Sequence, residues 1–272
     1  MRYLLVVFLV FGWLTGAGAQ EHPAQQVVDR EKTFVWADDE NFPPYIYRDN
    51  DGEIKGLFKD LMVELFSRVG VSLEYNVYAW KRTQLLVEGG AADGLVTVMT
   101  PRRSKVFFEA IPLLEVDEII FTRKDHPDIE QLKAISRVEE LKGFKIVEIV
   151  GSGWSEERLK GMDVVWVPQN NNAYLMLANR RADVYISNKY LGFWTIQHLI
   201  REYPLFSDNL KKLISCDHSL EKIHYSLLIN KKSKWTSLIP ELEKALKTMK
   251  SDGTYDRILK RYVEMGSKKM PQ

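Results

Sequence analysis

The sequence predicts an α/β protein with two lobes. Short apolar runs typical of strands alternate with stretches of helical periodicity, and this alternation occurs in two series. The polar segment at residues 123–127 separates the two series. A chain of 272 residues can also bury two cores. Strands separated by helices are expected to form right-handed βαβ units in a mainly parallel sheet.

Residues 1–19 have the pattern of a secretory signal peptide. A cationic start is followed by an apolar run from Tyr3 to Leu14 and by small residues that end at Ala19. The run is too short to span a bilayer, and its A-x-A ending predicts cleavage after Ala19; a retained membrane anchor is the alternative. Cys216, the only cysteine, lies far from that point, so neither a lipoprotein anchor nor an intramolecular disulfide is expected. The mature protein should be exported and soluble.

The first series begins with a strand at residues 33–36 and an acidic, proline-containing loop. From Leu57 to Val69, apolar residues recur at three- and four-residue spacing, and Gly70 follows at a helix C-cap position. This pattern predicts an amphipathic helix. The remaining elements of the series are expected at residues 73–78 (strand), 81–88 (helix) and 94–99 (strand).

In the second series, Ser136 and Glu139 are spaced as a capping box for a short helix. The run from Gln169 to Asn172 is interpreted as a loop and helix N-cap. No internal repeat or low-complexity tract is present, so a solenoid or a disordered module is not expected. Strands are predicted at residues 145–149, 164–167, 183–186 and 225–229, and helices at 172–179, 238–249 and 255–263.

Four short segments form a pattern whose order and spacing are specific. They are Phe42-Pro43-Pro44-Tyr45, residues 51–57, Gly90 to Gly94 leading to Thr100-Pro101-Arg102-Arg103, and residues 251–256. On these segments the chain, from Phe34 to about Tyr262, resembles bacterial extracellular solute-binding protein family 3, the amino-acid-binding type of periplasmic receptor that serves ABC importers.

The resemblance implies a periplasmic-binding-protein-like type II fold, in which two α/β lobes are joined by two crossing strands. Lobe 1 would comprise residues 30–121 plus 223–272, and lobe 2 residues 122–222. A small polar, carboxylate-bearing ligand, an amino acid or a related metabolite, would be trapped between the lobes by hinge closure. The implied location is the periplasm and the implied partner an ABC permease. We expect a monomer without cofactor or metal.

The resemblance also implies ligand contacts in lobe 1. Arg103 matches the arginine that grips the ligand carboxylate, and a guanidinium offers two parallel donors suited to two oxygens; Arg102 is the neighbouring alternative. Phe42 and Trp80 match aromatic positions against the apolar part of the ligand, with core packing as the alternative. Asp39 matches a loop position that contacts a cationic ligand end, or belongs to a solvated acidic loop. Thr97 and Thr100 are further expected contacts on the lobe 1 strand.

In lobe 2, Gly151 and Ser152 follow a strand and precede a predicted helix. Backbone N–H groups and the serine hydroxyl there could hold a carboxylate. Asn188 is expected to contact the ligand, because it stands where the family usually has an aspartate for the ligand ammonium. A neutral amide can bond an ammonium but cannot neutralise it, so common α-amino acids are expected to bind poorly.

Other classes of function lack a supporting pattern. The 38 Lys and Arg residues nearly balance the 37 Asp and Glu residues, which does not favour nucleic acid as a partner. The chain has no HExxH, no G-x-S-x-G elbow and no Walker or dinucleotide-binding motif, so we expect no enzyme. Two alternatives stay open: a ligand-sensing receptor that acts on a membrane signalling protein, and a periplasmic dehydratase or lyase on the same scaffold.

Overall fold

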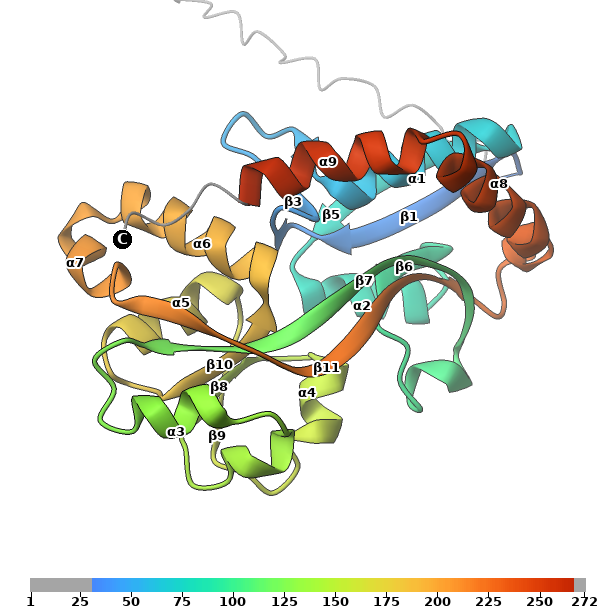
Figure 1. The fold of residues 1–272 in the computed structure, drawn as a ribbon. Coiled ribbons are helices and arrows are strands. Elements are labelled where there is room, and N and C mark those ends of the chain that lie inside the picture. The colour runs from blue at the N-terminus through green and yellow to red at the C-terminus, as the bar shows by residue number, and fades with distance from the viewer. Residues whose placement is uncertain (1–30, 267–272) are drawn as a thin grey trace, which may run out of the picture.

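The computed structural model describes residues 31–266, apart from the side chains of residue 217 and residues 263–266. Eight strands form one sheet in the order β5-β1-β6-β11-β7-β10-β8-β9. The two central strands, β7 (Phe107–Arg123) and β11 (Leu213–Asn230), are long, pair with each other and run through both halves of the molecule (Figure 1). The predicted α/β fold with two lobes joined by two strands is confirmed. The predicted signal peptide lies outside the described residues.

The first half is built from the β5-β1-β6 edge of the sheet and the helices packed on it. In α1 (Leu57–Val69) the buried residues recur at three- and four-residue spacing, as predicted, and Gly70 adopts φ 69° at the C-cap. Helix α9 extends along α1 and reaches α6 of the other half (Figure 1). The other elements of this half are β1 (Thr33–Asp39), β5 (Ser72–Tyr78), α2 (Trp80–Glu88), β6 (Gly94–Thr97), η1 (Arg103–Lys105), η4 (Lys234–Leu238), α8 (Ile239–Ser251) and α9 (Thr254–Gly266), with a small sheet of β2 (Asn41–Phe42), β3 (Ile46–Arg48) and β4 (Ile54–Lys55).

The second half is built from the β10-β8-β9 edge and the helices around it (Figure 1). In its hydrophobic core, the rings of Phe121 and Tyr174 pack edge to face, with 5.5 Å between their centroids. The elements are α3 (Ile129–Ala134), η2 (Val138–Leu141), β8 (Ile146–Ile149), α4 (Gly153–Arg158), β9 (Val164–Val167), α5 (Asn170–Ala178), β10 (Val184–Asn188), α6 (Lys189–Glu202), η3 (Pro204–Phe206) and α7 (Ser207–Leu210).

Three differences from the sequence predictions affect the central sheet or the second half. The outer strands are parallel, but β11 is antiparallel to β6 and β7, and β7 is antiparallel to β10, so the sheet is mixed. The predicted capping box of Ser136 and Glu139 is wrong by one residue at both ends, because the N-cap of η2 is Arg137 and Glu140 accepts the backbone N–H groups of Ser136 and Arg137 at 3.0 and 3.2 Å. Helix α6 was not predicted. It contains Gly192, which weakens a helical pattern but lets the helix approach the ring of Phe121.

The chain changes halves within β7 and β11. Strand β6 pairs with residues 226–229 of β11, whereas β10 pairs with residues 118–121 of β7. The predicted lobe boundaries, at residues 121/122 and 222/223, fall inside these two strands and stay a prediction.

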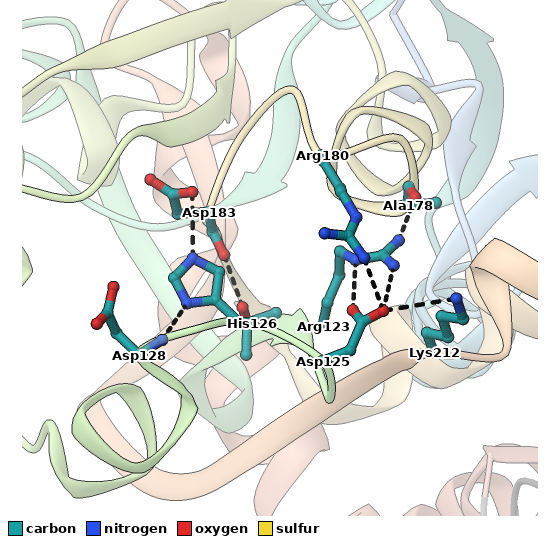
Figure 2. A network of polar contacts seen from close by, with 9 residues as sticks. Arg123, Asp125, His126, Asp128, Ala178, Arg180, Asp183 and Lys212 are labelled. Carbon is teal, nitrogen blue, oxygen red and sulfur yellow. Dashed lines mark hydrogen bonds and ion pairs between the residues drawn. The ribbon is translucent and has the colours of Figure 1, made fainter.

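A polar network fixes the end of β7 in the second half (Figure 2). The buried guanidinium of Arg123 bonds the Ala178 carbonyl at the end of α5 and pairs with Asp125 at 2.8 Å. Arg180 and Lys212 also pair with Asp125, and these cations, Arg123 first, lower its pKa to about 2. The network anchors the crossing strand to a helix. None of the described helices is long and apolar enough to cross a membrane.

Candidate functional site

A cavity of about 110 Å³ lies between the two halves. Both halves and both crossing strands contribute to its wall, so the cavity exists only when the halves are together. Its main polar and aromatic lining residues are Asp38, Asp39, Phe42, Trp80, Thr97 and Arg103 from the first half, Glu148, Ser152, Trp154, Ser155, Asn170, Tyr185 and Ser187 from the second, and Glu118 and Tyr225 from the crossing strands.

Arg103 is the cationic group of this cavity. It stands at the start of η1, where its backbone N–H donates to Thr100 Oγ1 at 3.2 Å, and only 6% of the residue is exposed. One guanidinium nitrogen donates to Thr97 Oγ1 at 3.1 Å and to the Val98 carbonyl at 2.7 Å. Among the described side chains no carboxylate forms an ion pair with it. Burial lowers its pKa to about 10, so it stays charged at neutral pH. Arg102, the alternative, is exposed.

The Gly151 carbonyl connects the two halves. It accepts hydrogen bonds from Trp80 Nε1 at 2.9 Å, Gln84 Nε2 at 3.3 Å and the second guanidinium nitrogen of Arg103 at 3.4 Å. Gly151 has φ +83°, and a Cβ there would lie 2.7 Å from Gln84 Nε2. A Cβ on Gly153 would lie 3.2 Å from Arg103 Cζ. The close approach of the halves therefore requires glycine at this turn.

The predicted anion-binding loop presents this carbonyl to Arg103. The Ser152 backbone N–H already donates to the Ile149 carbonyl at 2.9 Å, and the Ser152 hydroxyl contacts the Ser155 hydroxyl at 2.8 Å. A ligand carboxylate at Arg103 would therefore compete with the Gly151 carbonyl for one arm of the guanidinium.

Four carboxyl groups line the same cavity. Burial raises the pKa of Asp38 and Asp39 to about 7 and the pKa of Glu118 and Glu148 to about 8. Hydrogen bonds oppose this effect at Asp38, which accepts from Trp36 Nε1 at 2.9 Å and from the Val96 backbone N–H at 3.0 Å. Burial thus shifts all four acids of the cavity wall toward their neutral forms.

The two glutamates differ in how they are held. Glu148 accepts hydrogen bonds from the Ser155 hydroxyl at 2.9 Å and from the Ile186 backbone N–H at 3.2 Å. Glu118 is 6% exposed, and no backbone N–H or cation favours its charged form. Beyond burial, the charge of Glu221 raises the pKa of Glu118, and only the Tyr225 phenol opposes the rise. Glu118 is the carboxyl of the cavity with the fewest donors.

Asn188 lies outside the cavity lining. Its Oδ1 accepts from the Tyr45 hydroxyl at 2.6 Å and from the Leu191 backbone N–H at 3.0 Å, so it caps α6 and contacts the first half. Its Nδ2 is buried and has no hydrogen-bond partner among the described residues. In the antiparallel pair of β10 and β7, Asn188 stands directly opposite Glu118.

Of the nine residues predicted to contact a ligand, six line the cavity: Asp39, Phe42, Trp80, Thr97, Arg103 and Ser152. Thr100, Gly151 and Asn188 do not line it. Thr100 and Gly151 accept hydrogen bonds from Arg103, and Asn188 accepts one from the Tyr45 hydroxyl. The role of all nine as ligand contacts stays a prediction.

Sequence reasoning missed three of the acids and an amide. Glu148 is a single charge inside the apolar strand β8, which was the available signal, whereas Glu118 follows Asp117 in a strand with several acids and gave no such signal. Asn170, interpreted as part of a loop and cap, opens α5 and donates to the Asn41 carbonyl of the first half at 3.2 Å. Asp38 gave no signal apart from its neighbours in the acidic loop. Among the described residues, no three His, Cys, Asp or Glu side chains are placed to hold a metal ion.

The comparisons with known proteins agree with this architecture. The family model for bacterial extracellular solute-binding proteins, family 3, matches residues 34–265. No curated protein matches the chain in sequence.

Three solved structures show the same fold. A histidine kinase sensor domain with similarity to periplasmic binding proteins has 22% identity and a TM-score of 0.72, covering 86% of this chain and 97% of its own. A mutant of ArgBP from T. maritima has 22% identity and a TM-score of 0.68, covering 86% and 96%. The arginine-, lysine-, histidine-binding protein ArtJ from Geobacillus stearothermophilus has 20% identity and a TM-score of 0.68, covering 89% and 97%. The chain belongs to the bacterial extracellular solute-binding proteins of family 3.

Proposed function

We propose that this protein captures a small polar solute with a carboxylate group in the cavity between its halves and delivers it, in the periplasm, to an ABC importer. The observation that carries the proposal is the guanidinium of Arg103. It is buried and charged, and it faces the Gly151 turn of the other half without a carboxylate partner among the described side chains.

An unpaired buried cation is costly, so its presence calls for a function. The Arg103 guanidinium donates three hydrogen bonds, all to neutral oxygens of Thr97, Val98 and Gly151. A ligand carboxylate bound by two hydrogen bonds would supply the negative charge that these oxygens lack. Because the cavity is formed by both halves, binding and closure would be coupled: a ligand stabilises the closed form by its greater affinity for that form.

The ligand class draws support from two similar structures. ArtJ is an arginine-, lysine- and histidine-binding protein, and an ArgBP structure is described as arginine-bound. An amino acid or a related metabolite fits a cavity that contains both a guanidinium and carboxyl groups.

The test is a ligand search followed by one pair of variants. Mass spectrometry of gently purified protein identifies a retained solute, and a thermal-shift panel of metabolites confirms it. Arg103→Ala is expected to weaken binding of that solute by about 30-fold or more, the cost of removing one partner of a buried charged pair. Arg102→Ala is the matched control, because this neighbour is exposed and is expected to bind normally. Equal affinity in both variants would refute the proposal.

A second destination for the ligand-bound form is a membrane sensor. One similar structure is a histidine kinase sensor domain, so the same closed shape can serve signalling. Deleting the gene separates the two: loss of uptake of the identified solute supports import, whereas normal uptake with a lost transcriptional response supports sensing.

We propose no catalytic step. Carboxyls with a raised pKa are groups that acid–base enzymes use, and these would belong to the dehydratase or lyase alternative. The mass measurement therefore includes incubation of the solute with protein, and we expect its mass and amount to stay unchanged. A time-dependent change of mass would establish catalysis.

A further inference from the structure

Two exposed cations stand on the outer side of η1. The segment between β6 and β7, which contains η1, projects from the first half (Figure 1). Arg102 is the N-cap of η1 and Lys105 is its last residue, and the Lys105 backbone N–H donates to the Arg102 carbonyl at 3.3 Å. Side chains three residues apart eclipse each other in a 3₁₀ turn, so these two project on the same side. Both are exposed, whereas Arg103 between them is buried and lines the cavity.

A third cation, Lys231, reaches this turn from the end of β11. Its backbone N–H donates to the Val106 carbonyl at 2.9 Å, and its Nζ donates to the Ser104 carbonyl at 2.5 Å. These oxygens are neutral, so the positive charge of the ammonium is not compensated there. Among the described side chains, no carboxylate forms an ion pair with Lys231, Arg102 or Lys105. Three cations therefore share one small area of the surface.

An exposed phenyl ring lies beside these charges. Phe108, at the start of β7, is 46% exposed, and Lys231 Nζ lies 5.2 Å from the centroid of its ring. The neighbours Phe107 and Glu109 project to the opposite face of the strand. Phe107 is buried in the core there, and Glu109 accepts a hydrogen bond from the Ser226 hydroxyl at 2.6 Å. The face of Phe108 is thus both apolar and cationic.

We propose that this basic tip, defined as Arg102, Lys105, Phe108 and Lys231, docks on an anionic phospholipid surface. Cations are attracted to anionic headgroups, and an aromatic side chain beside them can enter the boundary between headgroups and acyl chains. A turn that projects from the molecule suits a flat bilayer surface (Figure 1). Docking would hold the protein at the membrane, which goes beyond the capture of a solute and does not use the cavity.

The charge of the tip distinguishes it from another exposed apolar segment. Residues 102–108 contain three cations and no acid, and Lys231 adds a fourth positive charge. On η3 of the second half, Leu205 is 97% exposed and Phe206 is 41% exposed. Residues 201–208 around them contain one Arg, one Glu and one Asp, a net charge of −1 (1 − 2). An anionic surface would therefore attract the basic tip and not η3.

Sedimentation with sucrose-loaded vesicles measures the binding. The chain is used from Gln20 onward, its expected mature form, so that the apolar run at residues 3–14 cannot bind lipid. Each exposed Lys or Arg near an anionic surface raises binding about fivefold, so three raise it about 100-fold. We expect this preference for vesicles of equal parts phosphatidylglycerol and phosphatidylcholine over phosphatidylcholine alone, and its loss at about 0.5 M salt. Equal binding to the two compositions, or a preference that salt does not weaken, overturns the proposal.

A double variant tests the cations of η1. Arg102→Ala combined with Lys105→Ala should bind the anionic vesicles about 25-fold more weakly, because two of the three exposed charges are lost. Lys142→Ala combined with Lys160→Ala is the matched control, since both lysines are exposed in the second half, and it should bind like the parent. Melting temperatures check that both proteins fold. An equal effect of the two double variants would show that net charge, and not the tip, determines binding.

A second pair of variants tests the ring. Phe108→Ser should weaken binding to the anionic vesicles about tenfold and keep its dependence on salt, because only apolar area is lost. Phe206→Ser is the matched control, as a phenylalanine of similar exposure on η3, and no change is expected. Unchanged binding of Phe108→Ser would refute the placement of this ring in the lipid boundary.

Soluble poly-L-glutamate tests an acidic protein as the partner instead of lipid. Binding to this polymer without binding to the anionic vesicles overturns the proposal in favour of an acidic protein surface. The proposed function is independent of this result, because the four residues of the basic tip lie outside the cavity lining.

Discussion

Replacing Trp80 by Phe tests whether the Gly151 carbonyl holds the two halves together. Trp80 Nε1 makes the shortest of the three hydrogen bonds to this carbonyl, at 2.9 Å. Phenylalanine keeps an aromatic ring beside Arg103, whose guanidinium carbon lies 5.5 Å from the Trp80 ring centroid. The change therefore removes one donor and leaves most of the ring contact.

The expected magnitude follows from that one bond. A neutral hydrogen bond contributes about 0.5–1.5 kcal/mol net to stability. A loss of about 1 kcal/mol lowers the closure equilibrium about fivefold. Gln84 and Arg103 already approach the same carbonyl at 3.3 and 3.4 Å, and they can shorten their bonds once Trp80 no longer competes. We therefore expect a decrease of two- to fivefold.

Two assays measure this change. Energy transfer between dyes on exposed positions of α3 and α8 reports the closed fraction without ligand, and calorimetry reports the apparent affinity, which falls with the closed fraction. Trp166→Phe is the matched control, because this tryptophan is 39% exposed on β9 and lies outside the cavity. An unchanged closed fraction in Trp80→Phe, or an equal loss in Trp166→Phe, would show that the Gly151 contact does not hold the halves together.

Two further predictions concern stability. The pKa values of Glu118 and Glu148 are raised from 4.5 to about 8 in the folded protein, so the folded protein retains protons that the unfolded chain releases above pH 4.5. In urea unfolding, the free energy of unfolding should therefore fall as pH rises from 5 to 8.5, and it should fall less steeply in Glu148→Gln. A free energy of unfolding that does not change with pH contradicts the burial of these groups. A Cβ on Gly192 would lie 1.9 Å from Cζ of the buried Phe121 ring, so Gly192→Ala should lower the free energy of unfolding by about 1–3 kcal/mol. Adding Phe121→Leu to the Gly192→Ala protein should recover part of this loss. A Gly192→Ala protein as stable as the parent rules out this contact.

Local patterns predicted the parts of the fold that local contacts determine. The period of α1 and the glycine after it predicted the helix and its end, because both depend on neighbours within one or two turns. The family resemblance, and not a local pattern, indicated Arg103 with Arg102 as the alternative; in the structure Arg102 is exposed at the N-cap of η1 and Arg103, the first residue of η1, is buried.

The acids of the cavity depend on contacts that no local pattern contains. Glu118 comes close to Asn188 only through the register of β7 and β10, since these two residues are 70 apart in the chain (188 − 118). Glu148 reaches the same cavity through the parallel pairing of β8 with β10. Glu148 is the lone charge of the short apolar strand β8, and this indicated that something unusual is buried there, whereas Glu118 is one of several acids in β7. That signal could not indicate that both charges share one cavity with an arginine.

The charges of the cavity constrain what can fill it. Four ionised carboxyls and one guanidinium would give a net charge of −3 (four negative, one positive), and burying such a charge is prohibitive. The raised pKa values reduce this conflict, because at neutral pH Glu118 and Glu148 are mostly protonated and Asp38 and Asp39 are about half protonated, so Arg103 is the only one of the five groups that is fully charged. An anionic ligand group would then meet a permanent cation, while a cationic group must displace a proton to obtain its partner. As pH rises through 7 and 8 these four carboxyls ionise, so binding of a carboxylate at Arg103 should weaken and binding of a cationic group should strengthen.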